Sequence, residues 1–383
     1  MDRRIFLQAL SVVMMACSVS ANGAVYYVSP AGNDSNNGTM SRPWKTINKA
    51  TEMVGPADKV LIRGGRYNIT STITFKRSGT EANPITFEAY PGEWPIIDGG
   101  KNCKVMLLTA SWNVLRNFEV TNSNSWGIEL SNASDNVIEG IVTHHNILSG
   151  LYLYMSSRIH MLSITSYSNY NPADGGGNSD GIGINSGTRN IFRNCVVYDN
   201  SDDGIDTWQS THNRLENCIS YKNGYDKGDG GGFKLGGAAV DGGNTVINCI
   251  TYGNSVVGFN YNAADIPDTL YNNTAWNNPT NYTFHRAAHV LRNNISYDGS
   301  VSIGDVVDDE YNNWNLGIID PEFINMDENS PDFLRLAASS PCIDVGVDVG
   351  ISFNGSAPDL GAIEYGTTGT SRSLWQKKVN KLR

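Results

Sequence analysis

Apolar and polar residues alternate over short runs along most of this chain, as they do between Val114 and Val120. A period of two residues is typical of β-strands, because successive side chains of a strand point to opposite faces. The runs end in Asn or Gly, and no long helical pattern separates them. The pattern therefore predicts a protein made almost entirely of short strands joined by turns.

The short runs belong to a repeat with a basic period of 23 residues. Its clearest copies, NCVVYDN, NCISYKN and NCITYGN, each end in Asn and have an aromatic residue two places earlier. The intervals are 23, 31, 23, 31 and 24 residues, between Asn146, Asn169, Asn200, Asn223, Asn254 and Asn278. The longer intervals hold an insert of eight residues. The aromatic residues are Tyr167, Tyr198, Tyr221, Tyr252 and Trp276.

Self-similarity at this period indicates a solenoid, and its short strands make the fold an all-β parallel β-helix. Successive coils of such a helix lie roughly 4.8 Å apart, so that equivalent positions form ladders. We expect the repeated Asn side chains to hydrogen-bond from coil to coil at one turn. We also expect the aromatic residues to fill the interior, together with Cys195, Cys218 and Cys249.

A second register of the repeat brings together five residues that are scattered in sequence. Four places after the Asn, once the inserts are removed, stands a glycine, then an apolar residue, then a variable one. The variable positions are Glu129, Tyr152, Gly183, Asp206, Lys234 and Asn260. Asp206 and Lys234 should therefore be neighbours on successive coils. The position before the glycine sets Asp180 beside Asp203, with Asp202 adjacent.

Four carboxylates this close together would repel one another unless a cation held them. Carboxylate oxygens are the ligands that Ca²⁺ prefers, so Ca²⁺ is the expected cofactor. The sequence has neither an EF-hand loop nor a His/Cys cluster typical of zinc. An alternative is that each Asp is simply a turn residue. Lys234 could equally be a solvated lysine paired with Asp206.

The ends of the chain differ from the repeats. Residues 1–24 contain Arg3 and Arg4, an apolar run and small residues, which predicts a secretory signal and a secreted protein. We expect one domain over 25–366, followed by a basic tail at 367–383. The domain divides into an N-terminal strand and cap at 25–58, coils at 59–299 and a C-terminal cap at 300–366. Helical spacing at 44–53 predicts a short helix that closes the open end of the solenoid.

The formal net charge of −10 argues against nucleic acid as a partner, because nucleic acids bind basic surfaces. No membrane-spanning segment is expected, and we expect a monomer. Five cysteines lie beyond the signal, and three of them share the ladder position described above. Because a buried free cysteine behaves as a small apolar residue, no disulfide framework is predicted.

Three motifs resemble polysaccharide lyase family 9, the pectate lyases: NSDG at 178–181, NSDDGID at 200–206 and NGYDKGDGGGFKLGG at 223–237. The resemblance implies a right-handed parallel β-helix of about ten coils. It implies Asp180, Asp202, Asp203 and Asp206 as calcium ligands and Lys234 as the catalytic base. The implied substrate is an acidic polysaccharide, polygalacturonate, and the sequence assigns no residue to its binding.

Such an enzyme cleaves a uronan by β-elimination, with Lys234 taking the C5 proton and calcium stabilising the developing charge. Two alternatives stay open. A β-helix hydrolase of the polygalacturonase type would use paired carboxylates instead, but the Gly-His-Gly and Arg-Ile-Lys motifs are missing. A non-catalytic glycan-binding β-helix would form no product at all.

Overall fold

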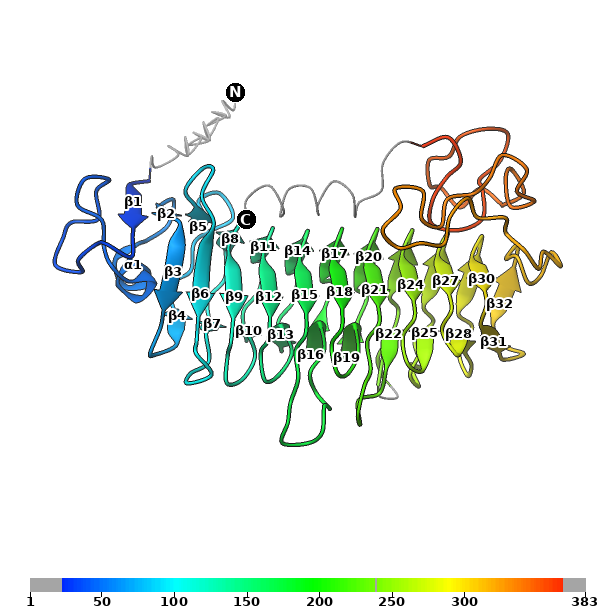
Figure 1. Ribbon diagram of the computed structural model, residues 1–383, viewed down its shortest axis with the longest axis horizontal. Helices are drawn as coiled ribbons and strands as arrows, with labels where there is room; N and C mark the ends of the chain where they lie inside the picture. The colour runs from blue at the N-terminus through cyan, green and yellow to red at the C-terminus, as the bar shows by residue number, and fades with distance from the viewer. Residues whose placement is uncertain (1–22, 238–239, 368–383) are drawn as a thin grey trace, which may run out of the picture.

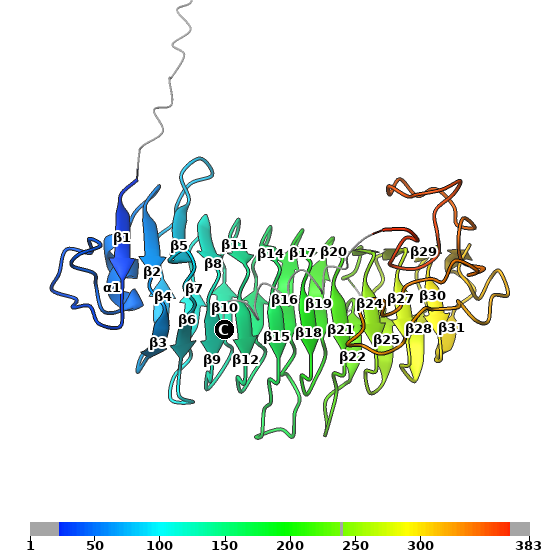
Figure 2. The same cartoon turned by 45° about the horizontal axis from the view of Figure 1, so that its top comes forward.

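The computed structural model describes residues 23–237 and 240–367, which form an elongated right-handed parallel β-helix (Figure 1). Three parallel sheets run along the long axis (Figure 2), and each complete coil contributes one strand to each sheet. The first sheet contains twelve strands, and the second and third contain ten each. The predicted all-β solenoid of about ten coils is therefore confirmed.

The first sheet contains β1 (Val25–Val28), β2 (Lys59–Ile62), β5 (Ile85–Ala89), β8 (Asn113–Arg116), β11 (Val137–Glu139), β14 (His160–Leu162), β17 (Ile191–Arg193), β20 (Arg214–Glu216), β23 (Thr245–Ile247), β26 (Thr269–Tyr271), β29 (Val290–Arg292) and β32 (Asp308–Glu310). The second sheet contains β4 (Ile73–Phe75), β7 (Met106–Leu108), β10 (Ile128–Ser131), β13 (Leu151–Tyr154), β16 (Ile182–Thr188), β19 (Ile205–Thr211), β22 (Gly231–Lys234), β25 (Val257–Asn260), β28 (Thr280–Phe284) and β31 (Ser300–Ile303). The third sheet contains β3 (Gly65–Asn68), β6 (Pro95–Asp98), β9 (Glu119–Thr121), β12 (Val142–His144), β15 (Thr165–Tyr167), β18 (Val196–Tyr198), β21 (Ile219–Tyr221), β24 (Ile250–Tyr252), β27 (Thr274–Trp276) and β30 (Ile295–Tyr297).

The predicted asparagine ladder is confirmed. Each buried side-chain amide donates to the amide oxygen of the next coil, with N–O distances between 2.8 and 3.0 Å, along Asn146, Asn169, Asn200, Asn223, Asn254 and Asn278. The same oxygen of Asn223 also accepts the backbone N–H of Asn200 at 3.1 Å. The ladder thus pairs polar groups that would otherwise be buried without partners.

Replacing Asn223 by alanine should lower the free energy of unfolding by about 2 kcal/mol or more, because two buried donors on Asn200 lose their acceptor. Thermal unfolding followed by circular dichroism measures the loss. The matched control is Asn124→Ala, since Asn124 lies exposed on another coil. Equal melting temperatures for the two variants would contradict this role of the ladder.

The interior was predicted correctly for the cysteines and wrongly for the repeated aromatic residues. Cys195, Cys218 and Cys249 are fully buried in the core. Val197 also points inward, so its neighbour Tyr198 must point to the outer face of the third sheet, because side chains alternate along a strand. The rings do stack from coil to coil, but on that outer face, along Tyr167, Tyr198, Tyr221 and Tyr252. The stacked rings inside the solenoid are Phe233, Phe259 and Tyr282.

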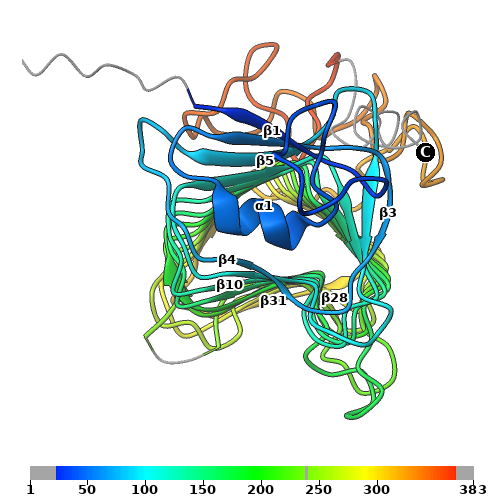
Figure 3. The same ribbon diagram turned by 90° about the vertical axis from the view of Figure 1, so that its left-hand side faces the viewer.

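The predicted N-terminal helix is confirmed as α1 (Ile47–Met53), which covers the open end of the solenoid (Figure 3). The Thr46 hydroxyl caps it by accepting the backbone N–H of Lys49 at 3.1 Å. Ile47 and Ala50 are buried against the first coils. Together they shield apolar side chains of the terminal coil from water.

The C-terminal segment packs along the outer face of the third sheet, where Phe333 contacts the rings of Tyr252 and Trp276. The predicted signal, apart from residues 23–24, and the predicted tail, apart from residue 367, lie outside the described residues. Within residues 23–237 and 240–367, no helix is long and apolar enough to cross a bilayer.

Candidate functional site

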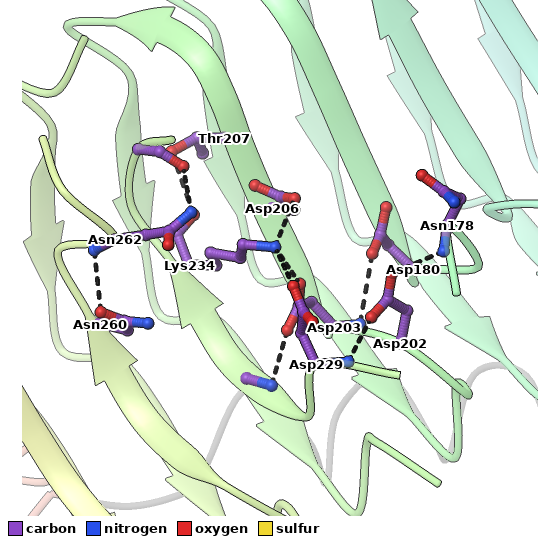
Figure 4. A network of polar contacts seen from close by, with 12 residues as sticks. Asn178, Asp180, Asp202, Asp203, Asp206, Thr207, Asp229, Lys234, Asn260 and Asn262 are labelled. Carbon is purple, nitrogen blue, oxygen red and sulfur yellow. Dashed lines mark hydrogen bonds and ion pairs between the residues drawn. The ribbon is translucent and has the colours of Figure 1, made fainter. Parts of the chain in front are cut away.

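The predicted row of variable positions exists on the outward face of the second sheet. Strand pairing sets its members opposite one another in the order Glu129, Tyr152, Gly183, Asp206, Lys234 and Asn260. Asp180 and Asp203 are also neighbours, since the backbone N–H of Asp203 donates to Asp180 Oδ1 at 3.2 Å. All five residues singled out in the sequence therefore lie in one cluster (Figure 4).

Lys234 lies at the centre of this cluster and has only 9% of its side chain exposed. Its Nζ is 3.0 Å from Asp203 Oδ2 and 3.4 Å from Asp206 Oδ2 (Figure 4). It also lies 2.8 Å from Asp229 Oδ2. The alternative of a solvated lysine is therefore wrong, although the expected pairing with Asp206 is confirmed.

Sequence reasoning missed Asp229. This residue lies in the glycine-rich insert before β22, and an insert has no place in the repeat register that located the other residues. Its carboxylate is 68% exposed, so it forms the solvent side of the ion-pair network around Lys234. The available signal was that this insert ends directly before Gly232 and Lys234, which belong to the register described above.

The two inserts are held together over the cluster. The rings of Tyr170 and Tyr225, one from each insert, stack with centroids 5.7 Å apart. The carboxylate of Asp202 accepts two backbone N–H groups, from Asn178 and from Asp229, both at 2.6 Å. Because each N–H belongs to a different insert, Asp202 ties both loops to the scaffold beneath them.

Burial and mutual repulsion make the carboxylates hard to ionise. Burial raises the pKa of Asp180 to about 8, and the nearby charges of Asp202 and Asp203 add to the effect. Burial also raises the pKa of Asp203, to about 6, although Lys234 opposes the shift. For Lys234 itself, burial lowers the pKa, but the charges of Asp203 and Asp206 outweigh burial and raise it overall. A metal-free cluster therefore favours a protonated lysine.

The donor set fits a hard cation. Asp180, Asp203 and Asp206 offer oxygens that all lie within 4.8 Å of one another, and Asp202, Asp203 and Asp229 form a second such group. Asp206 Oδ1 is buried and has no hydrogen-bond partner within the described ranges. An acceptor left in this state is costly, and a divalent cation would satisfy it. The aspartates thus form one cluster and are not separate turn residues.

An open cleft of about 500 Å³ lies above the cluster. Its charged lining includes Asp180, Asp202, Asp206, Asp229, Lys227 and Lys234, and its aromatic lining is Trp126, Tyr152 and Trp208. Sequence reasoning assigned no role to Trp126, although it precedes Gly127 in the same register in which Asp180 precedes Gly181. The site therefore combines a carboxylate cluster, a buried lysine and aromatic walls.

Comparisons with known proteins agree with this fold. Residues 26–294 match the family model described as "Pel9A-like, right handed beta helix region". Pectate lyase L of Dickeya dadantii is 29% identical, over 94% of this chain and 96% of the relative. The crystal structure of pectate lyase Pel9A superposes with a TM-score of 0.81 at 30% identity, over 90% of this chain and 98% of that one. A rhamnogalacturonan lyase superposes with a TM-score of 0.73 at 27% identity, over 92% and 98% of the chains.

Proposed function

Because this chain belongs to the Pel9A-like right-handed β-helix family and is a polysaccharide lyase, we propose that it is a secreted, calcium-dependent pectate lyase. The substrate class follows from the relatives, which are pectate lyases. The observation that carries the proposal is the buried Lys234 amongst carboxylates on the floor of an open cleft. Family membership argues against both alternatives considered above, a polygalacturonase-type hydrolase and a non-catalytic glycan-binding β-helix.

The residues that would hold Ca²⁺ are Asp180, Asp202, Asp203 and Asp206, and bound Ca²⁺ supplies positive charge that stabilises a developing anion on a sugar carboxylate. Asp180, Asp202 and Asp206 line the cleft in which a polyuronide chain would lie, and Asp203 is buried beside them. Without a cation, a protein of net charge −10 would repel such a polyanion. The carboxylate cluster therefore accounts both for substrate binding and for stabilisation of the reacting carboxylate.

Lys234 is the general base of the proposed elimination. Its Nζ forms a bond to the C5 proton, the C5–H electron pair becomes the C4–C5 double bond, and the C4–O bond breaks with its electron pair on the departing oxygen, which takes up a proton from water. Asp203 and Asp206 contact Nζ and thereby fix its position on the cleft floor. Neutralising their charge would remove the field that raises the pKa of Lys234, and burial would then favour the neutral amine that can accept a proton.

Mass spectrometry of the fragments formed from polygalacturonate tests the proposal. Elimination leaves an unsaturated sugar at each new non-reducing end, so a fragment with that end is one water lighter than its hydrolytic counterpart. We expect such unsaturated fragments, with saturated ones only from the original non-reducing end of the polymer. Saturated fragments alone would return the hydrolase as the better assignment, and an uncleaved polymer would favour a binding protein.

A second substrate is favoured by the structural match to a rhamnogalacturonan lyase. That backbone also offers a proton alpha to a carboxylate, so that the same base and cation could act on it. Parallel assays with polygalacturonate and rhamnogalacturonan distinguish the two. Faster cleavage of polygalacturonate supports the present proposal, and cleavage of rhamnogalacturonan alone would change the substrate but not the reaction.

Calcium should stabilise the protein more at alkaline than at acid pH. The folded-state pKa values of Asp180 and Asp203, about 8 and about 6, lie above those of the unfolded chain. Their contribution to stability is therefore fully present below about pH 4 and is lost as the pH rises towards about 8. Calcium binds the ionised carboxylates, so the calcium-induced rise in melting temperature should grow over this interval. Differential scanning calorimetry measures it, and an equal rise at every pH would contradict calcium binding by these groups.

A further inference from the structure

Three side chains are stacked at one end of the cleft. The rings of Trp126 and Tyr152 lie face to face, with centroids 4.4 Å apart and planes inclined by only 5°. On the other side of Trp126, the Nζ of Lys104 lies 4.9 Å from the ring centroid. Lys104 is itself held by an ion pair with Glu129. Glu129 thus holds Lys104 against one face of Trp126. Tyr152 is the last member of the stack on the side of the carboxylate cluster.

The next position in this direction is Gly183, which pairs with Tyr152 on one side and with Asp206 on the other. A Cβ atom at Gly183 would lie 2.7 Å from Asp180 Oδ2 and 3.2 Å from Tyr152 Cδ2. A side chain would therefore occupy the space between the ring and the carboxylates. Glycine leaves that space open, and both Tyr152 and Gly183 line the cleft.

We propose that Tyr152, backed by Trp126, is a sugar-binding subsite that stacks one pyranose ring of the polyuronide in the space above Gly183. This inference rests on the proposed function, because it names how the polysaccharide is seated at the same site. The face of an aromatic ring carries partial negative charge, and it attracts the C–H groups on the face of a pyranose. Tyr152 thus recognises the uncharged part of a substrate whose carboxylates face the cation.

The spacing supports this arrangement. Tyr152 and Asp206 are two strands apart, which corresponds to roughly 10 Å. A sugar in van der Waals contact with the Tyr152 ring would lie about 3.5–4.0 Å from it. The rest of the spacing between Tyr152 and Asp206 accommodates the next sugar of the chain, which then lies beside Asp206 and Lys234. A ring held by Tyr152 would therefore position its neighbour for the reaction.

Trp208 lines the same cleft but is less suitable for a test, because its ring lies only 5.6 Å from Lys234 Nζ. Replacing Trp208 would change the surroundings of the base as well as the cleft wall. Tyr152 makes no ion pair with the base and can be replaced more cleanly. Its matched control is Tyr154, which lies two residues along β13, is 40% exposed and is not part of the cleft lining.

The test measures binding of a defined galacturonate oligomer to the protein carrying Lys234→Ala, which prevents turnover, in the presence of calcium. Isothermal titration calorimetry should give a dissociation constant about tenfold higher after Tyr152→Ala. Tyr152→Phe should restore most of the affinity, because it keeps the ring face. Tyr154→Ala should leave the dissociation constant unchanged. In the protein that retains Lys234, Tyr152→Ala should raise KM more than it lowers kcat.

Calcium titration without the oligomer separates a subsite from damage to the cluster. Unchanged calcium affinity together with weaker oligomer binding supports the subsite. Unchanged oligomer binding after Tyr152→Ala, or an equal loss after Tyr154→Ala, would overturn it. Failure of the proposed function is a different result, because it appears as an absence of unsaturated product from the unsubstituted protein.

Discussion

Replacement of Lys234 by alanine is expected to lower kcat for polygalacturonate by about a thousandfold, the size of effect typical of a general base. The reason is geometric, since Lys234 is the basic side chain that lies buried among the proposed calcium ligands on the cleft floor. Lys234→Arg should be equally inactive, because a guanidinium group keeps its proton throughout the working pH range. Initial rates of ultraviolet absorbance by the unsaturated product give the measurement.

The control for this prediction is Lys222→Ala, which removes an exposed lysine that pairs with Glu328 outside the cleft. Its rate should match that of the unsubstituted protein. Calcium affinity should persist in both Lys234 variants, because an ammonium group offers the metal no lone pair. Appreciable turnover by Lys234→Ala would exclude lysine as the base.

The pH dependence should follow from the same residue. Only the neutral amine can accept a proton, and the carboxylates around Lys234 hold its pKa above the ordinary value. Bound calcium opposes those carboxylates, so activity should rise through the alkaline range, to an optimum at about pH 8–10. An acid optimum would instead favour a carboxylate base.

The second large effect is expected at Asp203, which belongs to both groups of converging carboxylates. Asp203→Ala should weaken calcium binding by about a hundredfold or more and remove most of the activity. Far-ultraviolet circular dichroism should keep its β-sheet signature, because the coils are held by the asparagine ladder. Calcium titration calorimetry and the absorbance assay provide the two measurements.

The control here is Asp305→Ala, since Asp305 is exposed after β31 and far along the sheet from the cluster. Its calcium affinity and activity should be unchanged. Full activity of Asp203→Ala in the presence of a chelator would show that no metal at this position takes part in the reaction.

The coil stacking and most of the candidate site could be predicted from the sequence, because in a solenoid the repeat period itself specifies which residues touch. The spacing of Asn200 and Asn223 predicted a hydrogen bond that is present at 3.0 Å. The same register predicted that Asp206 would pair with Lys234. In folds without repeats, neighbours of this kind cannot be found by counting.

Other features could not be predicted, because the period of the sequence repeat carries no information about them. The repeat aligned Tyr198 with Tyr221, but it did not say which face of the strand was inside. Asp229 belongs to an insert, so counting gave it no neighbour, and its contact with Lys234 required coordinates. The repeat gave Lys234 one carboxylate neighbour, Asp206, whereas Asp203 and Asp229 also contact its Nζ and help to raise its pKa.

A crystal structure of the Lys234→Ala variant with calcium and a galacturonate oligomer tests the proposed site most directly. We expect anomalous scattering from a calcium ion bound by Asp180, Asp202, Asp203 and Asp206, with oxygens at about 2.3–2.6 Å from the metal. A sugar carboxylate should share that ion, and C5 of the same sugar should face residue 234. An oligomer bound elsewhere, or a cluster that excludes calcium when the oligomer is present, would contradict the proposed mechanism.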